Sequence, residues 1–109
     1  MRSINPIPNH LLIDSIVYKP LISNDGWNDE FGEEKTIDNV RIVPTSSINR
    51  TANSEGKQAN DTIFIDYVNS SFFPEDVKVG DRINDREVIR VKVLKAFAEH
   101  PHHLEIEVI

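Results

Sequence analysis

The feature that most constrains the fold is a strict alternation of apolar and polar residues in the last quarter of the chain. The alternation covers Glu87–Phe97 and His102–Ile109. Because successive side chains of a β-strand point to opposite faces, this pattern predicts two strands that each bury one face. The side chains predicted to point inward are Ile89, Val91 and Val93 in the first segment and Leu104, Ile106 and Val108 in the second.

The charged residues between these apolar positions predict how the two strands pair. A hairpin that turns through Ala98–Pro101 places Arg90 opposite Glu107 and Lys92 opposite Glu105. Cross-strand pairs of opposite charge contribute roughly 0.2–1 kcal/mol each. They therefore favour this register over its neighbours.

The remainder of the chain supplies further short strands. Four segments are rich in β-branched and aromatic residues and are bounded by prolines or turn residues: His10–Lys19, Ile37–Val43, Asp61–Asn69 and Val79–Ile83. Apolar residues on both sides of the first segment predict a strand covered, at least in part, on both faces. In the third, Ile63, Ile65 and Tyr67 are expected to line one face. A turn is expected at Asn84-Asp85.

No segment shows a sustained helical period, so the sequence predicts an all-β fold, a small single-domain β-barrel or sandwich of five to seven short strands. Pro6 and Pro8 predict an extended N-terminal arm over residues 1–9, which leaves 10–109 for the domain. Asn24–Gly32 has the composition of a turn. Thr45–Asn60 is a long polar loop, and loops of that length in a compact domain are usually functional or disordered.

Composition excludes several classes of protein. The 109 residues include no cysteine, which rules out a disulfide scaffold, thiol catalysis and cysteine-ligated zinc. The net charge is −6, and an acidic chain is poorly suited to gripping a phosphate backbone. The chain has no apolar run of the roughly 20 residues that a membrane span needs, and no signal peptide is visible. These features predict a soluble, intracellular protein without membrane contact.

Catalytic and metal-binding patterns are weak. The sequence contains no G-x-S-x-G elbow, no P-loop and no H-E-x-x-H motif, so we expect neither an enzyme nor a cofactor. His100, His102 and His103 lie near Glu105, and imidazoles with carboxylates can bind zinc or nickel. However, these side chains flank an exposed turn, and the alternation points only His102 inward. We therefore expect no metal site.

Charge is distributed unevenly along the chain. Asp25–Asp38, which includes Glu33 and Glu34, holds six acidic residues against one basic residue, a net charge of −5. Arg86–Lys95, which includes Arg90 and Lys92, holds four basic residues against one acidic residue, a net charge of +3. The two segments are either ordinary surface patterning or complementary halves of a head-to-tail contact, which closes into a ring when the rotation permits.

The aromatic residues outside the alternating segments leave two roles open. Trp27, Phe31, Phe72 and Phe73 can cap the open ends of the barrel, or some can anchor a partner, because Trp and Phe are enriched at interface cores. Trp27 is the better anchor candidate of the four.

Several motifs in one order carry a resemblance to a known family. They are Pro6-x-Pro8-x-His10-Leu11-Leu12, Gly26-Trp27 with Phe31-Gly32, Asn39-Val40-Arg41-Ile42, Ile63-Phe64-Ile65-Asp66-Tyr67-Val68-Asn69-Ser70, Val79-Gly80-Asp81-Arg82-Ile83 and His103-Leu104-Glu105-Ile106-Glu107. In this order and spacing the chain resembles the small minor capsid proteins of tailed phages and prophages of Gram-positive bacteria. The similarity extends from about Pro6 to Val108.

The resemblance implies a structural virion protein of the head–tail connector, similar to the head-closure or stopper proteins. Such proteins look like small β-barrels in a homo-oligomeric ring, with portal or adaptor proteins on one side and tail proteins on the other. The matching long loop would be Thr45–Asn60, with Arg50 and Lys57 as its basic residues, reaching into the DNA channel as a gate. DNA would pass nearby without specific binding, and the protein would be in the host cytoplasm before assembly.

Two alternatives remain. One is a tail-terminator or other connector ring, which is also small and β-rich. The other is a soluble β-barrel binding module of the SH3-like or oligonucleotide-binding type. An oligonucleotide binder should carry aromatics interleaved with bases on a strand face. Arg90 and Lys92 have no aromatic residue beside them in the sequence.

Overall fold

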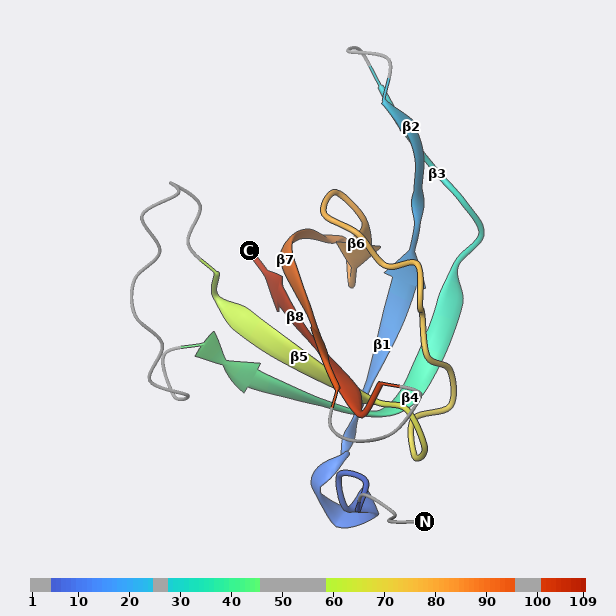
Figure 1. Cartoon of the computed structure of the whole chain (residues 1–109). Helices are drawn as coiled ribbons and strands as arrows, with labels where there is room; N and C mark the ends of the chain where they lie inside the picture. The colour runs from blue at the N-terminus through green and yellow to red at the C-terminus, as the bar shows by residue number, and fades with distance from the viewer. Residues whose placement is uncertain (1–4, 25–27, 46–58, 96–100) are drawn as a thin grey trace.

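The computed structural model describes residues 5–24, 28–45, 59–95 and 101–109, and its strands surround one core (Figure 1). Six of them form a closed barrel in the order β1-β4-β5-β8-β7-β6. Two further strands form a separate two-stranded sheet. The barrel strands are β1 (Asp14–Lys19), β4 (Lys35–Pro44), β5 (Asp61–Asp66), β6 (Arg82–Ile83), β7 (Arg86–Leu94) and β8 (His103–Val108), and the small sheet is β2 (Leu21–Asn24) with β3 (Asp29–Phe31).

The predicted fold class is confirmed. Within the described ranges helical structure is limited to 3₁₀ conformation, in η1 (Asn9–Leu11) and at Thr45, and every neighbouring pair of barrel strands is antiparallel. The architecture is a closed barrel rather than a sandwich. The part of the chain that the structure describes holds no helix that is both long and apolar enough to cross a membrane.

The register predicted for the last two strands is also confirmed. Arg90 pairs with Glu107 and Lys92 pairs with Glu105 across β7 and β8. The turn predicted at Ala98–Pro101 falls, except for Pro101, outside the described ranges. The predicted turn at Asn84-Asp85 joins β6 to β7, and its φ angles of 53° and 64° are those of a tight hairpin turn.

The core is a cluster of branched aliphatic side chains contributed by all six barrel strands. Burying each of them contributes roughly 1.5–3 kcal/mol relative to exposure. The fully buried members are Ile16, Ile37, Val40, Ile63, Ile65, Ile83, Val88, Leu104, Ile106 and Val108.

Three predictions about strand faces are wrong in part. The first strand begins at Asp14 instead of His10, because Leu11 N and Leu12 N donate to Pro8 O and Asn9 O and wind the chain into η1. As a result Ile13 is 70% exposed, so this segment is not covered on both faces.

The other two concern single residues. Tyr67 lies outside β5 and is exposed, because the chain turns directly after Asp66. Val93 is 46% exposed at the far end of β7, beyond an irregularity between Val88 and Arg90 that shifts the register.

The hairpin of β2 and β3 was missed at the sequence level, where Asn24–Gly32 is expected to be a turn. It projects beyond the barrel (Figure 1). Pro20 ends β1, and Gly32 N donates to Pro20 O at 2.8 Å to begin the hairpin ladder. The strands are only four and three residues long, so period-two alternation has too few residues in which to show.

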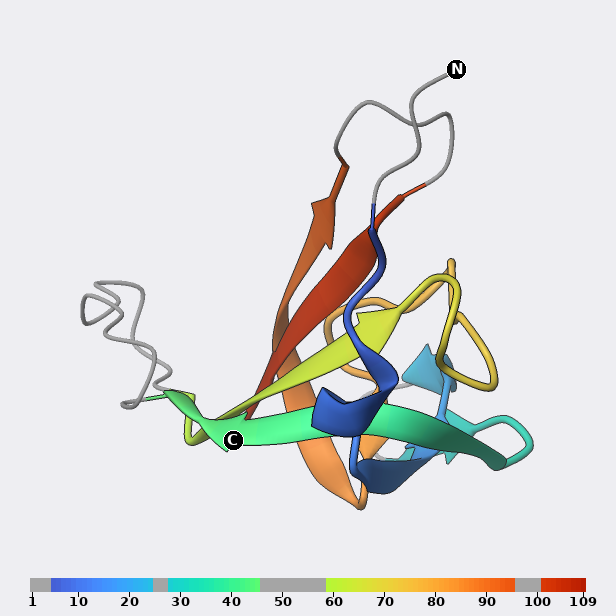
Figure 2. The same cartoon turned by 90° about the horizontal axis from the view of Figure 1, so that it is seen from below.

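The N-terminal segment crosses its own barrel from the start of β8 to β4 (Figure 2). His102 Nε2 lies 2.6 Å from Asn5 O, and Ile7 N donates to Asp66 Oδ1 at 3.0 Å. Arg41 donates to Leu11 O at 3.2 Å. Residues 5–11 are therefore held along the barrel by hydrogen bonds to three of its strands or strand ends.

Candidate functional site

A buried carboxylate holds the base of the projecting hairpin. Asp81 is fully buried in the segment before β6. Its Oδ1 accepts from Leu21 N at 2.8 Å and from the Lys78 ammonium at 3.0 Å, while its Oδ2 accepts from the Tyr18 hydroxyl at 2.7 Å and from Lys78 N at 2.9 Å. One side chain thus ties the end of β1 and the first residue of β2 to the turn at Lys78–Asp81.

The ionisation of this cluster follows from those contacts. Burial by itself would raise the pKa of Asp81, but the hydrogen bonds from Leu21, Tyr18 and Lys78 together outweigh it and lower that pKa. Burial, and then the hydrogen bond and charge of Asp81, raise the pKa of Tyr18. The cluster is therefore a carboxylate hydrogen-bonded to a neutral phenol, and it fixes the positions of the chain segments that it joins.

Gly80 supplies the backbone conformation that this cluster needs. Its φ is 101°, and a Cβ there would approach Leu21 Cδ2 at 3.0 Å. Only glycine adopts such a φ without strain.

A second buried carboxylate holds the N-terminal segment. Asp66 is fully buried at the end of β5, where its Oδ2 accepts from Val68 N and Asn69 N at 3.0 and 2.8 Å. Its Oδ1 accepts from Ile7 N, and Asn69 Nδ2 donates to Ile7 O at 2.7 Å. Sequence reasoning missed both Asp66 and Asp81 as anchors, although acids beside Gly or Asn in a turn are a usable signal for local hydrogen bonding.

The long loop is rooted on the barrel at both ends. Thr45 N donates to Asn60 O at 3.0 Å, and the Thr45 and Thr62 hydroxyl oxygens lie 3.1 Å apart. Asn60 N donates to Val108 O at 2.9 Å. Residues 46–58, including Arg50 and Lys57, lie outside the described ranges, so the gating role stays a prediction.

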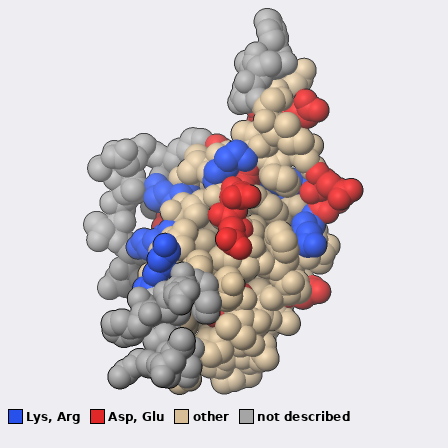
Figure 3. All heavy atoms as spheres, turned by 45° about the vertical axis from the view of Figure 1, so that its right-hand side comes forward, with Lys and Arg blue, Asp and Glu red and all other residues tan. Residues whose placement is uncertain are grey.

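The predicted interface residues have different surroundings. Arg90 Nε lies 2.9 Å from Glu107 Oε1, and Glu34 lies 3.3 Å from the Lys19 ammonium. Within the described part of the chain Lys92 and Glu33 make no ion pair. Acidic side chains appear on the projecting hairpin, above a barrel of mixed charge (Figure 3). Trp27 lies outside the described ranges, so its anchoring role also stays a prediction.

The outer face of the barrel brings together residues that are distant in sequence. Successive strand pairs align Arg41, Phe64, Glu105 and Lys92 in one row across β4, β5, β8 and β7. Phe64 therefore shares a face with Lys92, which the sequence did not reveal, but Glu105 lies between them. This acidic residue makes the row a poor platform for a nucleic acid.

His102 and His103 contact protein atoms around the start of β8. His103 Nε2 lies 3.2 Å from Glu105 Oε2, and His102 Nδ1 lies 2.9 Å from His103 Nδ1. His103 also contacts the Phe64 ring. No group of three or more potential metal ligands gathers among the residues that the structure describes, and His100 is outside them.

Comparison with known proteins identifies the family. No curated protein and no solved structure matches the chain. The model of one family, described as "Minor capsid protein", matches residues 8–108, which covers almost all of the sequence and every described strand. The chain therefore belongs to the minor capsid protein family, and it is a structural component of a phage virion.

Proposed function

We propose that this minor capsid protein is a head-closure subunit, which forms a ring below the portal, seals the DNA channel and joins head to tail. The observation that carries the proposal is the rooting of the long loop on the barrel. Thr45 and Asn60 hold its two ends together at the adjoining ends of β4 and β5. The barrel can therefore dock in a ring while the loop acts as a separate element.

Chain length and charge are compatible with a gate. The thirteen residues of the segment 46–58 can extend and return over about 20 Å. The net charge of −6 disfavours tight binding of phosphates, so DNA can pass when the gate opens. Portal or adaptor proteins and tail proteins are the proposed neighbours, and copies of the chain form the ring.

The test uses DNA-filled, tailless heads mixed with the purified protein. Electron microscopy should show added density at the portal vertex, and nuclease protection should show retained DNA. A variant with residues 46–58 replaced by a short Gly-Ser linker should bind heads but release DNA, because both loop ends are held by barrel contacts. A full-length control with Arg50→Ala and Lys57→Ala separates loop length from loop charge.

Three results would contradict the proposal. Normal DNA retention by the shortened variant removes the gating role. Rings on isolated tail tubes without head binding move the protein to the tail-terminator position. Binding to neither structure leaves a β-barrel module with another function.

A further inference from the structure

The barrel closes through a very short strand, which leaves part of β7 unpaired. On the edge opposite β8, Val88 exchanges hydrogen bonds with Gly80 N and Asp81 O at 3.0 and 2.9 Å, and β6 pairs with β7 only at Arg86 and Glu87. Beyond Val88, the described chain places no strand against this edge.

The ladder with β8 shows which backbone groups this edge presents. Leu94 O accepts from His102 N at 2.7 Å, so Leu94 faces β8. Alternate residues of an antiparallel strand turn their N–H and C=O groups to the same side. Val91 and Val93 therefore present theirs away from β8, and Lys92 lies between them.

The projecting hairpin has a matching free edge on β3. Gly32 N donates to Pro20 O, so Gly32 faces β2, and by the same alternation Phe31 and Asp29 present their backbone groups outward. Glu30 lies between them. The outer edge of β2, in contrast, is occupied at Leu21 by Asp81 and Lys78.

Each edge carries a charge that opposes pairing with its own kind. Lys92 is exposed and makes no ion pair within the described chain, and Glu30 is exposed and contacts only the Ser23 hydroxyl there, at 3.4 Å. Like charges directly opposite each other across two strands are destabilising. Pairing two β7 edges would bring two lysines together, and pairing two β3 edges would bring two glutamates together, so both of these pairings are disfavoured. A β3 edge against a β7 edge joins opposite charges.

We infer that the β3 edge of one copy of this chain adds to the β7 edge of the next copy. In the antiparallel register with Phe31 opposite Val91 and Asp29 opposite Val93, the outward N–H and C=O groups of all four residues meet and Glu30 faces Lys92. The inference deepens the proposed ring and rests on the proposed function for its place in the connector.

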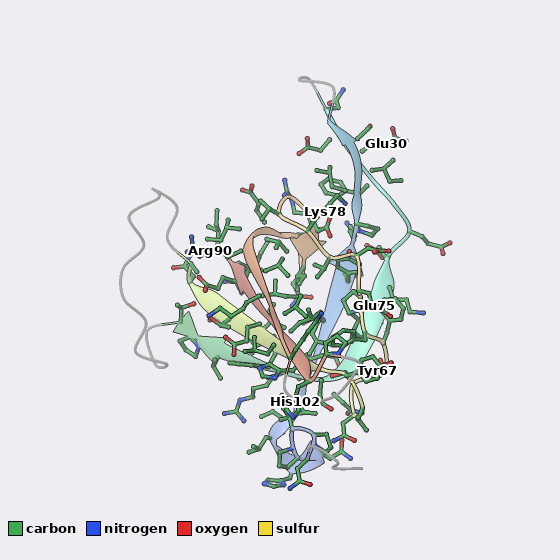
Figure 4. The ribbon with its side chains drawn as sticks, viewed as in Figure 1. Glu30, Tyr67, Glu75, Lys78, Arg90 and His102 are labelled. Carbon is green, nitrogen blue, oxygen red and sulfur yellow. The ribbon has the colours of Figure 1, made fainter. Side chains whose placement is uncertain are left out.

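The geometry of one copy suits a head-to-tail contact. Glu30 lies on the projecting hairpin, and Arg90, a β7 residue two positions before Lys92, lies well away from it on the barrel (Figure 4). The two edges therefore do not meet within a chain. Two different patches that meet between copies form a heterologous contact, which generates a ring when the rotation closes.

Disulfide trapping tests the contact directly, because the natural chain has no cysteine. Facing residues of a non-hydrogen-bonded antiparallel pair have Cα atoms about 4.5 Å apart, within the range that a disulfide spans. Single variants E30C and K92C are mixed and mildly oxidised, and peptide mass spectrometry identifies the bridges. We expect a 30–92 dimer from the mixture, and a ladder ending in a covalent ring from the double variant.

The matched control replaces Glu75, another exposed glutamate that is far from β3, in the variant E75C. A 30–92 bridge no more abundant than the 75–92 bridge overturns the inference. Head binding by the unmodified protein is scored separately. If the protein binds heads but the 30–92 bridge does not form, the inferred contact is wrong and the proposed function stands. If the bridge forms but the protein does not bind heads, the contact stands and the proposed function is wrong.

A charge exchange provides a second readout. Glu30→Lys and Lys92→Glu should each lower the association constant about twofold to fivefold per contact, and combining them in one chain should restore it. Sedimentation velocity measures the association. A double variant no better than the single variants would contradict the assigned register.

Discussion

Replacing Asp81 by asparagine tests the claim that one buried carboxylate holds the hairpin on the barrel. The change keeps the shape of the side chain but substitutes an NH₂ group for one of two oxygens that each accept two hydrogen bonds. If the nitrogen takes the Oδ2 position, Tyr18 can reverse its hydroxyl, but Lys78 N–H then faces a donor. If the nitrogen takes the Oδ1 position, Leu21 N–H and the Lys78 ammonium both face a donor.

Either orientation leaves at least one donor unsatisfied in a site where Asp81 is fully buried. An unsatisfied buried donor costs about 1–3 kcal/mol, and hydrogen bonds to a charged group are worth about 1.5–3 kcal/mol each. Since the remaining oxygen keeps two bonds, we expect Asp81→Asn to lower the free energy of unfolding by about 2–4 kcal/mol at pH 7. Urea denaturation followed by circular dichroism measures the change.

The dependence on pH adds a second test of the same cluster. The pKa of Asp81 is lowered in the folded protein, so its contribution is present above the unfolded pKa of about 4 and is lost as the pH falls through the lower folded value. The difference in the free energy of unfolding between the wild-type protein and Asp81→Asn should therefore become smaller below about pH 4. Asp76→Asn, an exposed control, should change stability by less than about 0.5 kcal/mol. A similarly small effect of Asp81→Asn at pH 7 would refute the reasoning.

Two further substitutions examine the barrel itself. Asp85→Gly should raise the free energy of unfolding by a few tenths of a kcal/mol, because Asp85 has a φ of 64° and Asn-Gly is preferred in such hairpin turns. This gain includes the loss of the exposed ion pair between Asp85 and Lys19. A melting temperature lower than that of the wild-type protein would contradict this prediction. A double-mutant cycle of Arg90→Ala and Glu107→Gln should give a coupling of roughly 0.5–1 kcal/mol, since the pair is only partly exposed, and a coupling of zero in urea denaturation would show that the pair is incidental.

The fold could be predicted where long strands alternate. The inward series Leu104, Ile106 and Val108 and the pairing of Arg90 with Glu107 both follow from period two and charge alone. The short hairpin could not be predicted, because its strands contain turn-forming and acidic residues and are held by Asp81, 60 residues from Leu21 in the chain. Local propensity carries no information about such a contact.

For the candidate interface surfaces, the sequence predicts the distribution of charge but not which charged side chains are paired within the chain. The uneven distribution of acids and bases correctly separates the hairpin region from β7, but it does not show that Arg90 is already paired with Glu107 and Glu34 with Lys19. Pairing inside the chain leaves Lys92 as the β7 cation available to a neighbour. On the acidic side, Glu34 is paired with Lys19 and Glu33 lies between β3 and β4, whereas Glu30 lies within a strand that has a free edge.

The buried carboxylate and the free edge of β7 both follow from the turn at Gly80-Asp81. This turn ends the pairing of the chain with β7 at Val88, and Asp81 then binds Leu21 at the start of the hairpin. Asp81→Asn should therefore reduce the yield of the 30–92 disulfide under native conditions in which circular dichroism still shows a folded barrel, because the hairpin loses its fixed orientation. Asp85→Gly, on the other side of β6, should leave that yield unchanged. Equal yields from the two variants would mean that the orientation of the hairpin does not depend on Asp81.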